Sequence, residues 1–336
     1  PGGVLLSVST TPPPPKNPPT KGGNPPAEAL PLSFSPADTA AAALVLCDFG
    51  DVEITAGNEG MIYRFDRHRR LKLFKRSAFD EYGDVTIYYP TNSRDDRLTN
   101  VKAQVFAPDG TSVELKGKEI FDEKVAEGLS AKKISFPNLQ EGSVIEFAYT
   151  LESGSYFELP EWYFQEGIPV RWSEYQMHIP LWYNYVFINQ GRECDIRETT
   201  NSSTTLMIPY TGSSSTGASV TRRAPEQVDI KHYRLVQKDI PALTEEAYMT
   251  TLKDYRARIR AQLSTVAFPS QPIQPVLSTW EKLAKELVDH ERFGNQYLKK
   301  RFTKQLMEDL QPILAKASNN TEKAFAVYQY LARPME

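Results

Sequence analysis

The amino-acid sequence predicts a mainly β protein, an antiparallel β-sandwich followed by a small all-helical C-terminal segment. Three observations carry this prediction. Short runs of β-branched and aromatic residues alternate with polar residues from about residue 40 to residue 237, as half-buried strands do. Turn residues separate these runs at short intervals, which favours antiparallel sheets over βαβ units. After Pro241 the apolar residues recur at helical spacing instead.

Residues 1–36 form a proline-rich stretch that we expect to be a disordered or extended tether. Eleven of the 25 prolines of the chain lie here. Because proline fixes φ and lacks an N–H donor, neither a helix nor a strand ladder can run through such a stretch. The sequence opens with Pro1 and not with Met, so an initiator region or signal peptide is either removed or not included in this sequence, and we expect export to the periplasm or the outer cell surface.

The sandwich is expected over residues 37–237. Its expected strands lie at 52–55, 62–74, 85–89, 101–105, 113–115, 132–136, 143–151, 170–179, 182–189 and 228–236. Within 101–105, apolar side chains alternate with polar ones, which places every second side chain in a core. The sequence Pro-Asp-Gly at 108–110 then supplies a turn, so this strand and the next form a hairpin.

Two segments depart from this alternation. The basic run Arg67, His68, Arg69 and Arg70 lies within an expected strand, and we expect it to be a solvated strand face. Residues 200–227 are rich in Ser, Thr and Gly and predict a polar loop that is either mobile or ordered by a partner.

Residues 238–336 are expected to be a helical segment. The first helix carries apolar residues on one face, namely Trp280, Leu283, Ala284, Leu287 and Val288. Further helices are expected at 297–317 and from about 320 to 331. In the last of these, Phe325, Tyr328 and Leu331 either pack on the other helices or form an apolar patch larger than a monomer tolerates.

Composition excludes several classes of function. The chain has 336 residues, 40% hydrophobic and 24% charged, with a formal net charge of −3, so it lacks the basic surface that nucleic-acid binding needs. No window reaches the roughly 18 to 20 apolar residues of a transmembrane helix. Neither a metal-ligand motif nor a phosphate-binding glycine loop occurs, so we assign no catalytic, cofactor-binding or metal-binding residue and expect no cofactor.

The two cysteines do not form a recognisable catalytic site. Cys194, His232 and Asp239 follow one another in the order of a transglutaminase-like triad, but Cys194 has acidic neighbours, which raise a thiol pKa, and His232 lies in a strand. Cys47 lies in an apolar run, where a buried and inert thiol is the expectation. We also expect no disulfide between Cys47 and Cys194.

Aromatic residues gather between 162 and 185, where two interpretations are open. They can be core and cross-strand pairs, or an exposed platform for a glycan or a protein partner. The residues that we keep as a candidate ligand or partner surface are Trp162, Trp172, Trp182, Tyr183, Tyr185, Phe325 and Tyr328.

Several motifs resemble one family. These are the small-residue run 37–48, the Arg-rich strand 62–74, the hairpin at 108–110, the sequence GSVIE at 142–146 and the sequence FQEGIPV at 164–170. They resemble the β-rich N-terminal domain of unknown function that precedes transglutaminase-like domains in exported proteins of the Bacteroidota. The resemblance covers 37–190, and more loosely the helical stretch 240–331.

The resemblance implies an envelope-associated β domain without chemistry of its own. In that family the nucleophilic Cys follows a segment like 322–331, and no Cys follows Cys194 here, so no nucleophile is carried over. Our leading hypothesis is a non-catalytic accessory or scaffold domain with a protein partner or a larger envelope assembly. The alternatives are the N-terminal part of an active transglutaminase-like cysteine peptidase, and a carbohydrate-binding module.

Overall fold

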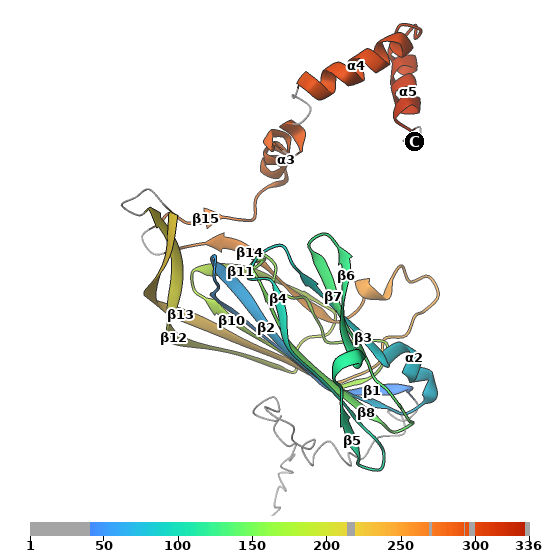
Figure 1. Ribbon diagram of the computed structural model, residues 1–336, viewed down its shortest axis with the longest axis vertical. Coiled ribbons are helices and arrows are strands. Elements are labelled where there is room, and N and C mark those ends of the chain that lie inside the picture. The colour runs from blue at the N-terminus through green and yellow to red at the C-terminus, as the bar shows by residue number, and fades with distance from the viewer. Residues whose placement is uncertain (1–40, 214–218, 269–270, 292, 296–299, 333–336) are drawn as a thin grey trace, which may run out of the picture. The chain divides into compact units, whose positions relative to one another are not determined.

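The computed structural model of the chain describes residues 41–213, 219–268, 271–291, 293–295 and 300–332 (Figure 1). Between Gln274 and Pro275 the chain divides into two compact units. The first unit consists of sheets and the second carries three helices among its described residues, so the predicted fold class is confirmed. The tether expected at 1–36 lies outside the described residues.

An eight-stranded sheet forms the centre of the first unit. Its strands lie side by side in the order β12 (Ile196–Ser213), β13 (Ser219–Ile240), β10 (Val170–Pro180), β1 (Ala43–Ala56), β2 (Met61–Leu73), β8 (Val144–Ser153), β4 (Arg97–Phe106) and β5 (Ser112–Glu114). Neighbouring strands are antiparallel except for β1 and β10, which are parallel.

Two smaller sheets complete the unit. One contains β11 (Tyr183–Gln190), β14 (Arg258–Val266), β15 (Gln274–Pro275) and β9 (Trp162–Tyr163), and the other contains β3 (Asp84–Pro90), β7 (Leu129–Ser135) and β6 (Ile120–Ala126). Short helices are η2 (Arg76–Ala78), α2 (Phe79–Tyr82), η3 (Gly117–Glu119) and η4 (Leu252–Asp254).

One hydrophobic core joins residues of all three sheets. At its centre the Trp162 ring stacks on Tyr175 with 5.2 Å between ring centroids, and Phe65 meets Trp162 edge-on at 6.3 Å. The indole N–H of Trp162 donates to Ser173 Oγ at 3.0 Å, so the one polar atom of the ring is satisfied. The strand next to this stack carries Gly50, where a Cβ would lie 2.5 Å from the indole.

A β-bulge in β1 decides which of its side chains face this core. The register against β2 shifts between Val45 and Cys47, which makes Leu46 an extra residue. Before the bulge, Val45 joins the core, and after it the even-numbered residues do. An extra residue reverses the facing of everything that follows, so the bulge turns the carboxylate of Asp48 inward.

The prediction of a polar loop at 200–227 is wrong. Strands β12 and β13 instead pair continuously from Ile196 opposite Val236 to Ser213 opposite Ser219. Threonine is β-branched and favours extended backbone, and the ladder to β13 satisfies the peptide groups. Past Pro180 the strand β10 ends, and β12 and β13 run on as a two-stranded ribbon (Figure 1).

The sandwich also extends further along the chain than the boundary expected at residue 237. Strand β14 pairs with β11 from Gln190 opposite Arg258 to Tyr183 opposite Val266. Its residues Ile259, Ala261 and Leu263 are buried. The first unit therefore reaches Gln274, because β14 supplies core residues to the sandwich.

The second unit contains α3 (Trp280–Asp289), α4 (Lys300–Leu314) and α5 (Asn320–Leu331), close to the expected helices. The Thr279 hydroxyl caps α3 by accepting from the N–H of Lys282 at 3.3 Å, and Asn319 Oδ1 caps α5 by accepting from the N–H of Glu322 at 2.9 Å. These bonds satisfy backbone donors that a helix start leaves free. Among the described residues, no helix has the length and apolar character to cross a membrane.

Candidate functional site

The aromatic residues singled out from the sequence divide between core and surface. Trp162, Tyr183 and Tyr185 are buried in the sandwich core, so these three rings are not available to a ligand at the surface. Trp172 and Trp182 are half-buried. Trp172 donates to Glu174 Oε2 at 3.1 Å and lies under the ammonium of Lys238, while Trp182 packs edge-on against Phe268.

The helical candidates are exposed. Phe325, Tyr328 and Leu331 on α5 have 60%, 67% and 64% of their surface accessible, and Trp280 on α3 has 83%. Of the two outcomes expected for α5, the structure therefore shows exposure of these side chains and not packing on the other helices. We call Trp280, Phe325, Tyr328 and Leu331 the exposed helix residues; large apolar side chains in this state are typical of surfaces that bind other proteins.

The basic run expected to be a solvated strand face is instead largely buried. Along β2 the inward-facing row consists of Met61, Tyr63, Phe65, Leu71 and Leu73, which belong to the core, and of two arginines between them. These two, Arg67 and Arg69, point into the sandwich, whereas His68 and Arg70 are buried on the opposite face of the sheet. A charge inside a sandwich requires a partner, and each of the four has one.

Asp48 and Glu166 are the partners of the inward arginines. Arg67 donates to Asp48 through Nε at 3.0 Å and through a terminal nitrogen at 2.6 Å, which is a bidentate pair. Arg69 donates to Glu166 at 2.6 Å and lies 3.5 Å from Asp48. Burial disfavours both guanidinium charges, but the carboxylates more than offset it, so the pKa values of Arg67 and Arg69 are raised.

The opposite face of the sheet, on which His68 and Arg70 lie, holds a second buried group of charges. Glu146 accepts from Arg70 at 2.7 Å and lies 2.5 Å from the imidazole of His68. Burial raises the pKa of Glu146, but His68 and Arg70 outweigh it and hold that pKa below its usual range. The basic run is thus divided by strand parity, with one pair of residues serving each face of β2.

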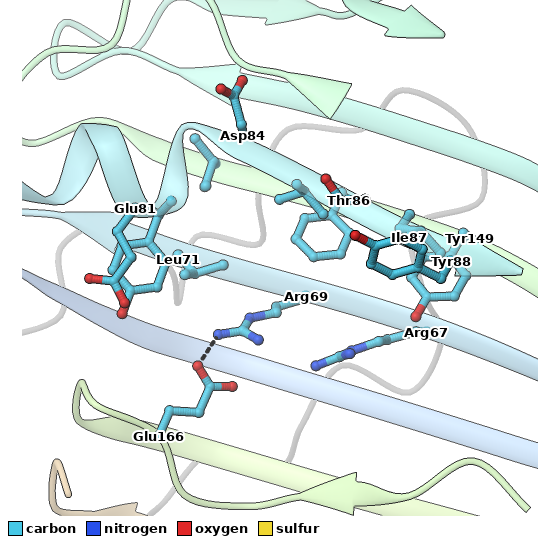
Figure 2. A pocket seen from close by; sticks show the side chains of 14 residues that line it. Arg67, Arg69, Leu71, Glu81, Asp84, Thr86, Ile87, Tyr88, Tyr149 and Glu166 are labelled. Atoms are coloured by element: carbon cyan, nitrogen blue, oxygen red, sulfur yellow. Dashed lines mark hydrogen bonds and ion pairs between the residues drawn. The ribbon is translucent and has the colours of Figure 1, made fainter. Parts of the chain in front are cut away.

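A cavity of about 460 Å³ lies beside the inward arginines, between β2 and β8 on one side and β3 and α2 on the other (Figure 2). Figure 2 shows Arg67 and Arg69 at one wall, with Glu166 joined to Arg69 by an ion pair. The Arg69 Nε atom is buried without a hydrogen-bond partner. The buried N–H that Arg69 leaves unsatisfied suits non-covalent binding of a hydrogen-bond acceptor, and the other polar side chains of the cavity are Arg67, Thr86, tyrosines and carboxylates.

The three residues that follow one another in triad order, Cys194, His232 and Asp239, do not come together as a catalytic unit. His232 Nε2 lies 2.6 Å from Ser202 Oγ, and its Nδ1 lies 2.6 Å from His178. Asp239 pairs with Arg171 at 3.4 Å. Burial raises the pKa of the Cys194 thiol, although a hydrogen bond from Gln237 opposes this, so the thiolate is disfavoured at neutral pH.

Both cysteines are free, as expected. Burial raises the pKa of Cys47 to about 12, so this thiol is the inert one that its apolar run predicts. Within the part of the chain that the structure describes, no group of three or more His, Cys, Asp or Glu side chains is arranged to hold a metal ion.

Sequence reasoning missed Asp48, Glu166 and His178. One signal was available for the arginine site, because two arginines at alternate positions of an otherwise apolar row indicate inward charges that need carboxylates. The identity of those carboxylates was not accessible, since Asp48 precedes Arg67 by 19 residues and Glu166 follows Arg69 by 97.

Comparisons with known proteins agree with this fold. A family described as "Domain of Unknown Function with solved-structure structure (DUF3857)" matches residues 63–244. A solved structure from Parabacteroides distasonis, described as a "putative protease", is similar with a TM-score of 0.57 and 16% sequence identity. The similarity covers 86% of this chain and 50% of that chain, so this chain spans about half the length of the solved protein, and the likeness shows the fold alone. No curated protein matches.

Proposed function

The chain belongs to the DUF3857 family, and we propose that it is a non-catalytic accessory domain that binds a transglutaminase-like catalytic domain. The observation that carries this proposal is the exposure of Phe325, Tyr328 and Leu331 along one helix, α5. Burying one such side chain contributes about 1.5–3 kcal/mol, so a surface of this kind gains stability when a partner covers it.

We infer the class of partner from the sequence resemblance, which the structural neighbour supports. The sequence resembles β domains that precede transglutaminase-like domains, and a solved protein described as a protease carries the same fold over half its length. A transglutaminase-like cysteine peptidase domain, on the same or on another polypeptide, is therefore the occupant that we propose for the helix surface. Intact mass of the natural gene product distinguishes these two arrangements.

The chemistry of the described residues supports an accessory role. The pKa values of both thiols are raised, that of Cys47 to about 12, whereas a cysteine nucleophile needs a lowered pKa and an adjacent base. Neither cysteine lines the cavity beside Arg69, which offers donors and carboxylates for binding. If incubation with amide substrates gives turnover that the Cys194→Ser variant abolishes, the accessory role is wrong.

An exported, envelope-associated location is part of the same proposal. It rests on the resemblance to exported proteins of the Bacteroidota, the group to which Parabacteroides distasonis belongs. Cell fractionation with the natural host tests it, and recovery in the cytosolic fraction alone would contradict it.

Binding measurements test the docking surface directly. The Phe325→Ser/Tyr328→Ser variant removes two exposed rings, and Gln329→Ser changes an exposed polar residue of the same helix. With the cognate transglutaminase-like domain in a calorimeter, we expect the double variant to weaken binding by at least about tenfold, the equivalent of 1.4 kcal/mol, and the control to bind like the wild type. Equal affinities of all three proteins would refute this docking surface.

A further inference from the structure

Strand β12 is an open edge of the large sheet. Within the described chain β12 pairs only with β13 and stands last in the strand order. The side chains of residues 197–205 are exposed, on both faces of the strand. An edge of this kind presents a row of backbone N–H and C=O groups that can accept another strand.

The usual devices that protect an edge are missing from the middle of β12. Natural edges are blunted by lysines, prolines, bulges or inward charges. Residues 199–208 contain no charged residue and no proline, and the register against β13 shows no shift over its whole length. The edge is therefore free of register shifts, uncharged over 199–208 and open to pairing.

The order of residues along β12 identifies the strand that fits. Read outward from Ser202 in both directions, the centre of the strand is symmetric in residue type: Asn201 mirrors Ser203, Thr200 mirrors Thr204 and Thr199 mirrors Thr205. Further out, Ile196 mirrors Ile208, whereas Glu198 mirrors Leu206 and Arg197 mirrors Met207. Two antiparallel copies centred on Ser202 would place each residue opposite its mirror position. Threonine would then face threonine at the centre and isoleucine would face isoleucine at the ends, which are favourable cross-strand pairs, and no like charges would be opposed. The pairs of Glu198 with Leu206 and of Arg197 with Met207 would add nothing comparable.

We propose that the chain self-associates through β12, with two copies paired antiparallel about Ser202 so that their large sheets become one continuous sheet. The contact is isologous, because residue i of one copy meets residue j of the other and j meets i, as two-fold symmetry requires. The backbone ladder supplies the attraction. Since the exposed side chains of 197–205 are all polar, the contact gains little from apolar burial, and the dimer is concentration-dependent and not permanent.

Cysteine cross-linking tests the register. In the proposed dimer the two copies of residue 202 lie directly opposite, with Cα atoms about 4.5–5.5 Å apart, within the range of a disulfide. The Ser202→Cys protein should therefore give a covalent dimer on mild oxidation. Thr204→Cys is the matched control, exposed on the same face, because its two copies are displaced by four residues, about 13 Å along the strands.

A mixture makes the test stricter. Position 200 of one copy lies opposite position 204 of the other, so an equal mixture of the Thr200→Cys and Thr204→Cys proteins should cross-link to each other, while each alone should not. Wild-type protein, which retains Cys47 and Cys194, measures any background. No covalent dimer with Ser202→Cys, or equal cross-linking by Thr204→Cys alone, would overturn the proposal.

Charge substitution tests the interface without cysteines. Thr200→Lys/Thr204→Lys opposes like charges twice across the two-fold axis, and we expect sedimentation to show at least about tenfold weaker dimerisation. Thr200→Lys/Thr204→Glu alters the same exposed positions but opposes unlike charges, so it should retain the dimer. Circular dichroism confirms that each variant is folded. A wild type that stays monomeric at every concentration, or a dimer that both variants leave unchanged, would refute pairing through β12.

Discussion

His178 and His232 lie directly opposite each other on β10 and β13, and their Nδ1 atoms are 2.6 Å apart. The outer nitrogen of His178 lies 3.0 Å from Asp51, and that of His232 lies 2.6 Å from Ser202. A carboxylate only accepts, so His178 donates to Asp51, His232 donates to His178, and Ser202 donates to His232. In this series of hydrogen bonds, every ring nitrogen has a partner when both imidazoles are neutral. If both imidazoles were protonated, the Nδ1–H groups of His178 and His232 would point at each other and repel.

We expect the two histidines to titrate in separate steps. Burial lowers the pKa of His178, but the hydrogen bond and charge of Asp51 outweigh it and the pKa is raised. Burial and then the charge of His178 lower the pKa of His232. The contribution of His178 to stability is thus present below the unfolded pKa of about 6.5 and lost as pH rises through its folded pKa. That of His232 is present above about 6.5 and lost as pH falls through its folded pKa.

Imidazole NMR signals recorded against pH check this prediction. Because coupled sites report shared values, variants make the assignment. Asp51→Asn should lower the pKa of His178, and His178→Gln should raise that of His232. Identical titration of both rings in the wild type, or no change in either variant, would contradict the described hydrogen-bond chain.

Removing the carboxylate of Asp48 should strongly destabilise the sandwich. Asp48→Ala leaves the buried guanidinium of Arg67 without its bidentate partner, and breaking a buried ion pair in this way costs about 3–5 kcal/mol. Glu123→Ala breaks the exposed pair with Lys133, which water and salt screen, so it should change stability far less. Urea unfolding at neutral pH measures both, and equal losses would show that the Asp48 pair is solvated.

Adding one methyl group at Gly50 should also destabilise the core. Its Cβ would lie 2.5 Å and 2.8 Å from atoms of the Trp162 indole, and overpacking of this kind costs about 1–3 kcal/mol. Gly60→Ala is the matched control, since nothing lies within 4 Å of a Cβ there. If the thermal midpoints of Gly50→Ala and Gly60→Ala were equal, the stacked rings of Trp162 and Tyr175 would be able to shift and accommodate the methyl group without loss of stability.

The two thiols should react slowly and at different rates. Burial raises the pKa of Cys47 to about 12, so at pH 8 only about one molecule in ten thousand carries the thiolate. Below its pKa, each unit of pH should raise the alkylation rate about tenfold. Both thiols are half-buried, but the hydrogen bond with Gln237 opposes the rise in the pKa of Cys194, so Cys194 should react faster. Mass spectrometry after iodoacetamide treatment measures both sites, with denatured protein as control, and rapid labelling of Cys47 in the folded protein would contradict its burial.

The sequence allowed prediction of those strands that have one apolar face. The alternation at 101–105 corresponds to β4, and that at 143–151 to β8. β12 was missed because residues 197–205 are exposed on both faces, so no apolar alternation marks the strand. Its pairing partner β13 decides its conformation, and pairing is not written in local composition.

The sites were less accessible than the fold. The burial of Arg67 and Arg69 depends on the parity of β2 and on the bulge that turns Asp48 inward, and a bulge leaves no reliable mark in a sequence. His178 and His232 are 54 residues apart, and only the register between β10 and β13 brings them together. By contrast, the exposed apolar face of α5 follows directly from helical spacing and was predicted as one of two outcomes.

The parallel pairing of β1 with β10 has a consequence for how the protein folds. Val45 lies opposite Val170, so the middle of the sheet closes a loop of about 125 residues, and contacts of such long range form slowly. A chain emerging from the ribosome can build the β1–β2 hairpin early, yet one side of β1 stays unpaired until β10 arrives. That side is an aggregation-prone edge rich in Val and Leu. We therefore expect synthesis of this domain to depend on a chaperone that shields nascent β1.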